Sequence, residues 1–256
     1  MLKIGRIPYT NLFPIYYYLE MSSGSKYEFI EGVPSDINRL IREGRIDISP
    51  SSSIEYLRRP EKYILVPGHS VSSEGPVGSI LLFSRRPIET LDGATVLYTH
   101  QSETSAALLR IVLSRFYQLQ CTLESSGLPL EEGLRDHSAY LLIGDDALRE
   151  VHRGPNLYIY DLGDIWYRKT GLPFVFALWI ANKGTGAELK SFIPDLDEAK
   201  DRALKDLPKI ARTCPFRKWL SEKQLIDYWS KLSYDLDNKH CQGLELFNKY
   251  LREPGI

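Results

Sequence analysis

One pattern of apolar and polar residues recurs along this chain. An apolar run ends in a polar turn, and apolar residues at helical spacing follow the turn. The clearest example covers residues 94–113. A β-branched and apolar run ends at Tyr98, a polar turn occupies residues 99–105, and apolar residues return at helical spacing from Leu108 to Leu113. This pattern predicts a strand, a hydroxyl-rich turn and a helix.

The same construction recurs at three other places. Its turns contain Thr10 and Asn11 after a strand over 4–9, Ser49 to Ser53 after a strand ending at Ile48, and Gly144, Asp145 and Asp146 after a strand over 140–143. Ligands of open α/β sheets bind beyond the carboxyl ends of the strands, where helix N-termini point at them. Four such turns predict a single polar cleft.

Hydroxyl groups at a helix N-terminus favour an anion, because the first N–H groups of a helix are unpaired and carry partial positive charge. Ser102, Thr104 and Ser105 are therefore candidates to hold a carboxylate or phosphate. The alternative interpretation of Ser102 is a simple N-cap. Asp145 and Asp146, at another predicted helix start, are likewise first of all capping candidates.

The order of the elements predicts two lobes joined by two long apolar strands. Residues 78–84 take the chain out of the first lobe, and residues 172–179 bring it back. The predicted first lobe comprises residues 1–85 and 176–256, and the second lobe residues 86–175. This is the plan of an α/β, two-lobe, periplasmic-binding-protein type 2-like fold with an interdomain cleft, whose hinge closure excludes water from the ligand.

Capping signals predict where several helices begin. Asp161 to Gly171 has the form of a helix ended by glycine. After residue 179 the chain is expected to be helical, with capping-box spacing at Asp195 and Glu198 and again at Ser221 and Gln224.

Composition limits the classes of function. The 256 residues are 43% hydrophobic, with 32 lysines and arginines against 33 acidic residues and no basic block, which argues against a nucleic-acid partner. No apolar stretch approaches the roughly 20 residues of a membrane span, and the N-terminus has no apolar signal region, so we expect a cytoplasmic protein and no membrane partner. Three widely spaced cysteines fit neither a disulfide framework nor a zinc site.

An ordered set of short motifs resembles the menaquinone-biosynthesis chorismate dehydratases. The resemblance spans residues 4–179, and each motif is weak alone while the ordered set is specific. The motifs are residues 4–14 (IGRIPYTNLFP), 44–47 (GRID), 52–56 (SSIEY), 78–81 (GSIL), 102–105 (SETS), 142–148 (LIGDDAL), 161–166 (DLGDIW) and 171–179 (GLPFVFALW).

The resemblance implies a substrate and a reaction. Chorismate would lose water to give 3-[(1-carboxyvinyl)oxy]benzoate in the futalosine route to menaquinone. Because the ring becomes aromatic, the driving force is internal to the substrate, and no metal or organic cofactor is required; the sequence has neither a metal-ligand cluster nor a Gly-rich dinucleotide loop. The partner would be a small dicarboxylate, held by N–H and hydroxyl donors.

Under this resemblance Asn11 and Ser79 are the leading catalytic candidates. Asn11 offers an amide at the end of the first strand, and Ser79 lies where the chain leaves the first lobe. Their alternative roles are turn hydrogen bonding and close strand packing. The predicted substrate-binding residues are Ser52, Ser53, Ser102, Thr104, Ser105, Gly144 and Asp145.

The proton acceptor stays open between three groups: Asp145, His100 and the enolpyruvyl carboxylate of the substrate itself. In the last case the enzyme would mainly fix conformation and polarise the departing hydroxyl. Two other classes also remain. One is the 1,4-dihydroxy-6-naphthoate synthase type of lyase from the same pathway, and the other is a non-catalytic cytoplasmic small-anion-binding protein on the same fold.

Overall fold

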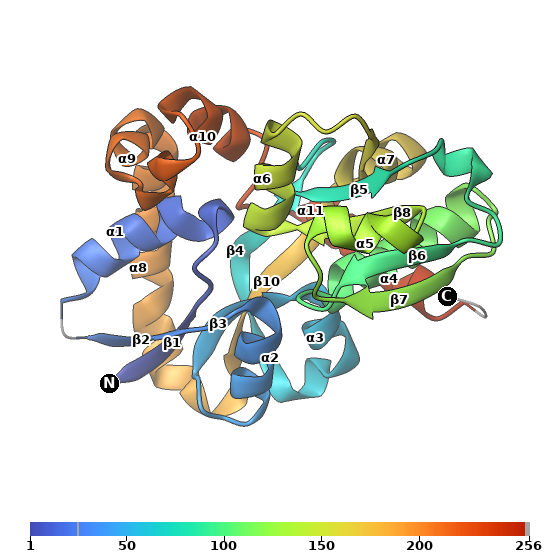
Figure 1. The fold of residues 1–256 in the computed structure, drawn as a ribbon. Coiled ribbons are helices and arrows are strands. Elements are labelled where there is room, and N and C mark those ends of the chain that lie inside the picture. Colours follow the sequence, from blue (N-terminus) through green and yellow to red (C-terminus); the bar gives the residue numbers. More distant parts are fainter. Residues whose placement is uncertain (25, 254–256) are drawn as a thin grey trace. The chain divides into compact units, whose positions relative to one another are not determined.

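The computed structural model describes residues 1–24 and 26–253 and divides them into two compact units. The first unit comprises Met1–Ser72 and Phe176–Leu236, and the second comprises Ser73–Val175 and Asp237–Ile256. Each unit is an α/β domain built on one five-stranded mixed sheet (Figure 1). The chain passes from one unit to the other three times.

The first unit has the strand order β2-β1-β3-β10-β4. Its elements are β1 (Leu2–Arg6), η1 (Thr10–Leu12), α1 (Phe13–Ser23), β2 (Tyr27–Glu31), α2 (Pro34–Arg42), β3 (Ile48–Ser52), α3 (Ser53–Arg58), η2 (Pro60–Lys62), β4 (Tyr63–Ser73), β10 (Phe174–Asn182), η5 (Lys183–Thr185), α8 (Gly186–Lys205), α9 (Leu207–Thr213), η6 (Pro215–Lys218) and α10 (Glu222–Trp229). β1 pairs in parallel with β2 and β3, whereas β10 runs antiparallel to β3. The carboxyl ends of β1, β2 and β3 therefore share one edge of the sheet.

Aromatic side chains fill the core under α1 and α8, which lie side by side (Figure 1). Tyr16 of α1 is 2% exposed and contacts Trp179 of β10, which in turn contacts Phe192 of α8. In the same sheet, a Cβ added to Gly5 of β1 would lie 2.5 Å from Ser49 Cβ of β3. Glycine at this position thus allows β1 to approach β3 closely.

The second unit has the strand order β7-β6-β8-β5-β9. Its elements are β5 (Ile80–Ser84), η3 (Ile88–Thr90), β6 (Thr95–Thr99), α4 (Glu103–Ile111), a π-helical turn η4 (Val112–Phe116), β7 (Thr122–Ser126), α5 (Leu130–Asp136), β8 (Ala139–Ile143), α6 (Gly144–His152), β9 (Tyr158–Asp161), α7 (Leu162–Thr170) and α11 (Asn238–Leu251). β6 is parallel to β7 and β8, and β5 is antiparallel to both β8 and β9.

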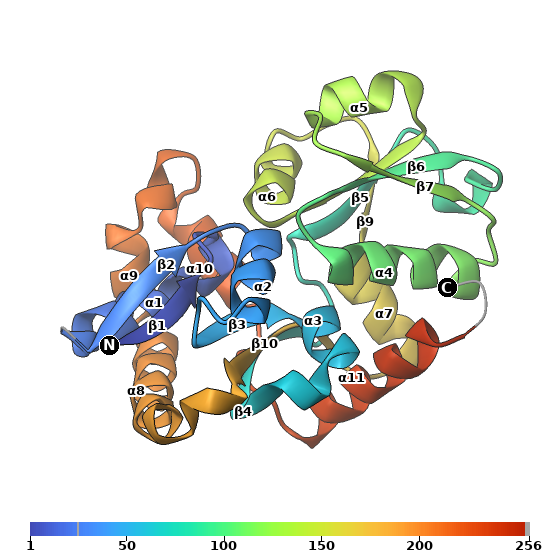
Figure 2. The same cartoon turned by 90° about the horizontal axis from the view of Figure 1, so that it is seen from below.

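Helices cover both faces of the second sheet. α5 and α6 lie on one face, where Leu134 and Ala147 pack with Phe83, Leu97 and Tyr140 (Figure 2). α4 and α7 lie on the other face, with α11 beside them. Buried apolar residues of β5, β6 and β8 and of the helices that cover them give the unit a core of its own.

The two units differ from the predicted lobes at two boundaries. Residues 73–85 were expected in the first lobe but belong to the second unit, because β5 pairs with β8 and β9 in the second sheet. The C-terminal helix α11 also belongs to the second unit. There, Phe247 packs against Trp166 and Phe174, at centroid distances of 6.3 and 4.9 Å.

The structure corrects one local expectation. The serine-rich stretch predicted as a turn is strand β3 up to Ser52, paired with β10 and buried along its whole length. A second hydroxyl-rich stretch, Ser70 to Ser73, is likewise extended, as the end of strand β4. In both places hydroxyl side chains imitate a turn signal, while pairing with neighbouring strands decides the conformation.

The capping signals have mixed outcomes. Asp161 caps α7 and Gly171 ends it in the left-handed conformation, as predicted, and Ser221 with Gln224 forms a complete capping box at α10. Asp195 instead lies inside α8, where its carboxylate accepts a hydrogen bond from Tyr27 Oη at 2.5 Å. In this case a tertiary contact explains the acidic residue better than a cap.

Gly243 provides a test of the packing of α11. A Cβ at this position would lie 2.1 Å from the carbonyl oxygen of Pro173, so a Gly243→Ala substitution must push the helix away. We expect the free energy of unfolding in urea to fall by about 2–3 kcal/mol, as in overpacked cores. Gly184→Ala is the matched control, because nothing lies within 4 Å of its Cβ. Equal stability of the two variants would contradict the close packing of α11.

Candidate functional site

Asn11 lies in the short helix η1, at the edge of the first sheet beyond the carboxyl end of β1. Its Oδ1 atom is buried and accepts no hydrogen bond from any residue that the structure describes. A buried acceptor without a partner is rare in native proteins and calls for a functional explanation. The catalytic role predicted for Asn11 stays a prediction, and this free acceptor is compatible with it.

The backbone of this turn is held from behind by two aromatic side chains. Trp229 Nε1 donates to the carbonyl oxygen of Thr10 at 2.8 Å, and Tyr234 Oη donates to that of Asn11 at 2.5 Å. Both aromatic residues are buried. Their hydrogen bonds fix the direction in which the Asn11 side chain leaves the chain.

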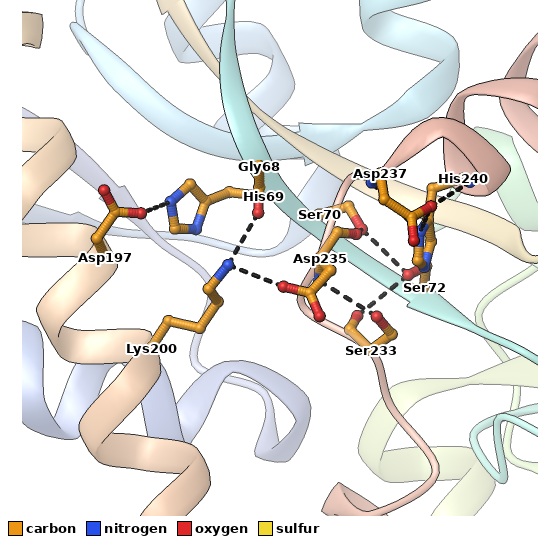
Figure 3. A network of polar contacts seen from close by, with 10 residues as sticks. All are labelled: Gly68, His69, Ser70, Ser72, Asp197, Lys200, Ser233, Asp235, Asp237 and His240. Carbon is orange, nitrogen blue, oxygen red and sulfur yellow. Dashed lines mark hydrogen bonds and ion pairs between the residues drawn. The ribbon is translucent and has the colours of Figure 1, made fainter.

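Ser233 and Asp235, the two neighbours of Tyr234 in the chain, are held by polar contacts with β4 and α8 (Figure 3). The backbone of the preceding residue, Ser233, pairs with Ser72, and Lys200 Nζ binds the carboxylate of the following residue, Asp235, at 2.9 Å. Lys200 also donates to the carbonyl oxygen of Gly68 at 3.0 Å. The hydrogen bond to Asn11 thus comes from a segment fastened on both sides.

Ser52, at the end of β3, shares the same sheet edge. The side chain of Asn38 in α2 forms two hydrogen bonds with it: Nδ2 donates to Ser52 Oγ at 2.8 Å, and Oδ1 accepts from Ser52 N at 3.1 Å. The hydroxyl oxygen is thus already an acceptor, and its hydrogen has no acceptor among the described residues. Ser52 can therefore donate to an anion. Ser53, the next predicted binding residue, begins α3 and is fully buried.

A buried carboxylate anchors α3 at this edge. Glu55 is 2% exposed and binds Arg42 at 2.6 Å, Arg59 at 3.3 Å and Tyr63 Oη at 2.7 Å. Burial by itself raises the pKa of this carboxyl, but the hydrogen bonds from Arg42 and Tyr63 and the charges of both arginines outweigh it and hold the pKa below its usual range. The ionised Glu55 ties α3 to α2.

Four segments converge on one edge of the second sheet. β6, β8 and β9 all run in the same direction, and β5 runs the opposite way between β8 and β9. The N-termini of α4, α6 and α7 therefore lie at the same edge as the amino end of β5. This arrangement brings together the predicted residues Ser79, Gly144 and Asp145 and the α4 turn.

Ser79 precedes β5 and is 3% exposed. Its carbonyl oxygen accepts a hydrogen bond from Gly144 N at 2.7 Å. The backbone N–H of Gly144, a predicted substrate donor, is thus engaged with Ser79. A φ of 57° at Gly144 allows the sharp turn from β8 into α6 and explains why glycine is favoured there.

The α4 turn is a capped helix start. Ser102 is the N-cap, its Oγ accepting from Ser105 N at 3.2 Å and lying 3.1 Å from Ser105 Oγ. Thr104 and Ser105 are buried. The capping interpretation of Ser102 is confirmed, and any contact of these hydroxyls with a ligand stays a prediction.

The first turn of α6 departs from the expected capping. Its N-cap is Ile143, no side chain caps it, and Asp145 and Asp146 follow within the first turn. The capping interpretation of the two aspartates is therefore wrong. Asp145 remains at the converging edge, half-buried, as a candidate acidic group.

Two histidines have clear contacts: His100 lies in the turn between β6 and α4, and His69 lies on β4 of the first unit. His100 is exposed, and its Nδ1 lies 3.3 Å from the carbonyl oxygen of Ser126. His69 is buried on β4 and binds Asp197 at 2.8 Å; burial and the charge of Lys200 lower its pKa, although Asp197 and Asp235 oppose them.

The sequence pattern marks Asp161 only as a helix start. Its carboxylate accepts hydrogen bonds from the backbone N–H groups of Val77, Gly78, Gly163 and Asp164. Burial raises the pKa of this carboxyl even though the four N–H groups favour its charged form. An aspartate before Leu-Gly-Asp indicates a helix cap in the sequence. The N–H groups of Val77 and Gly78 lie more than eighty positions away, so no local pattern predicts their hydrogen bonds to Asp161.

Two cavities lie away from the predicted residues. A cavity of about 410 Å³ is lined by Arg6, Glu20, Tyr27, Phe29 and Glu31, among others, and one of about 490 Å³ lies around Arg110, Leu119 and Cys121. Across residues 1–24 and 26–253, no three His, Cys, Asp or Glu side chains gather as a metal-binding group. The helices in these ranges also include none that is long and apolar enough to cross a membrane.

Two α/β units, each with an antiparallel strand inserted among parallel ones, define the class of periplasmic-binding-protein-like folds. Solved structures agree. The alkanesulfonate-binding protein SsuA from Xanthomonas axonopodis pv. citri, bound to MOPS, aligns with a TM-score of 0.71 and 14% identity over 99% of this chain and 94% of its own. Protein AF1704 from Archaeoglobus fulgidus aligns with a TM-score of 0.77 and 16% identity over 97% and 96% of the two chains.

Within this class the chain belongs to the menaquinone biosynthesis family, whose profile matches residues 2–253. It is 30% identical to a chorismate dehydratase of Thermus thermophilus over 98% of this chain and 95% of that protein. It is 25% identical to a 1,4-dihydroxy-6-naphthoate synthase of the same organism over 79% and 73% of the two chains. The resemblance drawn from the sequence motifs is confirmed.

Glu55 makes the stability of the first unit sensitive to acid. Because its pKa is lowered on folding, its contribution is complete above the unfolded value of about 4.3 and is lost as the pH falls further. Glu55→Gln leaves two arginines without their buried partner, and we expect a loss of about 3 kcal/mol in the free energy of unfolding at pH 7. The loss should shrink on acidification.

Chemical denaturation between pH 7 and acid measures this effect. Glu61→Gln, at an exposed position nearby in the sequence, is the matched control and should unfold like the wild type. A Glu55→Gln protein as stable as the control at pH 7 would contradict the anchoring role.

Proposed function

We propose that this protein is a chorismate dehydratase. The observation that carries the proposal is the 30% identity with the Thermus thermophilus chorismate dehydratase along 98% of this chain. The motifs that suggested the same activity include the turns that hold Asn11, Ser52 and Ser79. In the proposed reaction chorismate is converted to 3-[(1-carboxyvinyl)oxy]benzoate and water.

The reaction is an elimination. The C–H bond beside the enolpyruvyl ether breaks, its electron pair forms a ring double bond, and the C–O bond of the neighbouring hydroxyl breaks. The proton and the hydroxyl leave as water, and the ring becomes aromatic. No electron leaves the substrate, so no oxidant or reductant takes part.

The enzyme has to hold two carboxylates, orient the hydroxyl and provide a route for the proton. Ser52 supplies a hydroxyl hydrogen for a carboxylate, and Asn11 Oδ1 supplies an acceptor for the substrate hydroxyl. Ser79 is proposed to contact the departing group. Fixed donors and acceptors of this kind lower the barrier because they require no reorganisation during the reaction.

The substrate's own enolpyruvyl carboxylate is the proton acceptor we propose. His100 is exposed and faces the carbonyl of Ser126, which disfavours it as the base. Asp145 remains the competing acceptor. An Asp145→Asn variant that lost all turnover while binding substrate normally would favour the side chain over the substrate carboxylate.

The direct test is incubation of the purified protein with chorismate, without added metal or cofactor, followed by mass spectrometry and ultraviolet spectroscopy. The expected product is lighter by one water and has a benzenoid spectrum. Unchanged chorismate with folded protein would overturn the proposal. Turnover of cyclic dehypoxanthine futalosine would then assign the synthase reaction, and calorimetric binding without turnover would assign a binding protein.

Asn11→Asp and Ser79→Ala test the assigned residues. We expect each to lower kcat about 100-fold, the usual loss when one group that stabilises the transition state is removed. Asn156→Ala, at an exposed loop position, is the control and should retain the wild-type kcat. Full turnover by folded Asn11→Asp and Ser79→Ala proteins would refute the assignment.

A further inference from the structure

Asp161 divides its two carboxylate oxygens between two structural elements. Oδ1 accepts from Gly163 N at 2.9 Å and Asp164 N at 3.2 Å, which caps α7, and from Val77 N at 3.2 Å. Oδ2 accepts from Gly78 N at 2.6 Å, the shortest contact of the four. Oδ1 mainly caps the N-terminus of α7, and Oδ2 holds Gly78, the residue before Ser79.

The backbone around Ser79 is thereby fastened on both sides. Toward β9, Gly78 N–H is bound by the Asp161 carboxylate, and toward β8, the Ser79 carbonyl oxygen accepts from Gly144 N at 2.7 Å. The flanking Gly78 and Gly144 have φ values of 76° and 57°, so the chain bends sharply at both places. Such a bend has few hydrogen bonds of regular secondary structure, and side-chain acceptors must replace them.

The start of α7 is also pressed against the segment that precedes Ser79. A Cβ on Gly163 would lie 2.8 Å from the carbonyl oxygen of Gly75 and 2.8 Å from Ser73 Oγ. Ser73 Oγ in turn donates to the Gly75 carbonyl at 2.9 Å. Glycine at position 163 lets the capped helix end approach this segment, so that Asp161 reaches Gly78.

We propose that Asp161 is a positioning residue that holds the backbone before β5 and so places Ser79 for the dehydration reaction. The inference rests on the proposed function, in which Ser79 contacts the departing group. In this role Asp161 touches no reacting atom, since its carboxylate binds four backbone N–H groups of its own unit. A displacement of about 1 Å at such a position is enough to lower a rate about 100-fold.

Asp161→Asn separates the two duties of the carboxylate. Asparagine caps helices as well as aspartate does, so Oδ1 can continue to accept from Gly163 and Asp164. The other oxygen becomes an NH2 group, which faces Gly78 N–H and cannot accept from it. The helix cap survives while the bond to Gly78 is lost.

Asp237→Asn is the matched control. Asp237 caps α11 in the same unit, and its Oδ1 accepts from Lys239 N at 2.8 Å and His240 N at 3.0 Å. The same exchange there alters a helix cap without touching the segment before β5. We expect wild-type kcat and wild-type exchange at Gly78 from this variant.

The first measurement is amide hydrogen exchange, which does not depend on any activity. In Asp161→Asn we expect the Gly78 amide to exchange about tenfold faster or more, and the Gly163 and Asp164 amides to keep their protection. An unchanged Gly78 amide would overturn the inference. Should Asp161→Asn fail to fold, Asp161→Ser keeps a capping oxygen but is too short for Gly78, and the same measurement applies.

The second measurement is chorismate turnover per folded enzyme. We expect kcat to fall about tenfold to 100-fold in Asp161→Asn with little change in KM, and the double variant Asp161→Asn, Ser79→Ala to be no slower than Ser79→Ala alone. This non-additivity shows that Asp161 acts through Ser79, which a purely structural role would not produce. A normal kcat, or fully multiplicative losses, would overturn the inference.

The two measurements separate the two hypotheses. If the wild type does not dehydrate chorismate, the proposed function fails, whereas faster exchange at Gly78 in Asp161→Asn still supports Asp161 as the residue that holds the Ser79 segment. If the wild type is active and the variant matches it, the proposed function stands and the positioning role fails.

Discussion

β5 in the second sheet and β10 in the first run antiparallel to strands beside them, and this reversal decides which residues join the polar edge of each sheet. β5 lies antiparallel between β8 and β9, so its amino end is at the edge where the other strands have their carboxyl ends. Ser79 is therefore at the same edge as the N-termini of α6 and α7. In the first unit β10 is antiparallel to β3, and its residue Ala177 pairs with Ser52. The amino ends of β5 and β10 thus lie at the edges of their own sheets where β8 and β3 have their carboxyl ends.

The reversal also creates a need for unusual hydrogen bonds. The segment ahead of β5 cannot join the regular ladder, because it bends at Gly78 and is flanked by helix starts. Its N–H and C=O groups are satisfied by the Asp161 carboxylate and by Gly144 N instead. Backbone polar groups that are buried must find such partners. The polar character of this edge is therefore partly a structural requirement and partly an opportunity for ligand binding.

The fold class and the main strand-turn-helix units could be predicted from the sequence, because hydrophobic periodicity and caps are local signals. The helix from Asp161 to Gly171 and the capping box at Ser221 follow from neighbouring residues alone. Features decided by distant contacts could not be predicted. β3 extends through its serines because β10 pairs with it, and α11 joins the second unit because Phe247 finds Trp166 and Phe174.

The candidate site shows the same division. Asn11, Ser52 and Ser79 could be selected because motifs and turns mark them, whereas the second duty of Asp161 could not. Its donors Val77 and Gly78 are separated from it by 84 and 83 positions. No local pattern identifies such a partnership, and only the pairing of β5 with β9 brings the residues together.

The polar side chains at these edges differ in how many hydrogen bonds they make within the protein. The Asp161 carboxylate receives four N–H groups from its own unit, so its acceptor capacity is used within the protein. Ser52 is intermediate: its oxygen is occupied by Asn38, and its hydrogen has no acceptor among the described residues. Asn11 is the opposite case, because its Oδ1 is buried and receives no hydrogen bond from the described residues. Leaving such a group unsatisfied costs about 1–3 kcal/mol, and its backbone is nevertheless held in place by Trp229 and Tyr234. The combination of a fixed backbone and an unsatisfied acceptor supports the proposed role of Asn11, in which its Oδ1 accepts a hydrogen bond from the substrate hydroxyl.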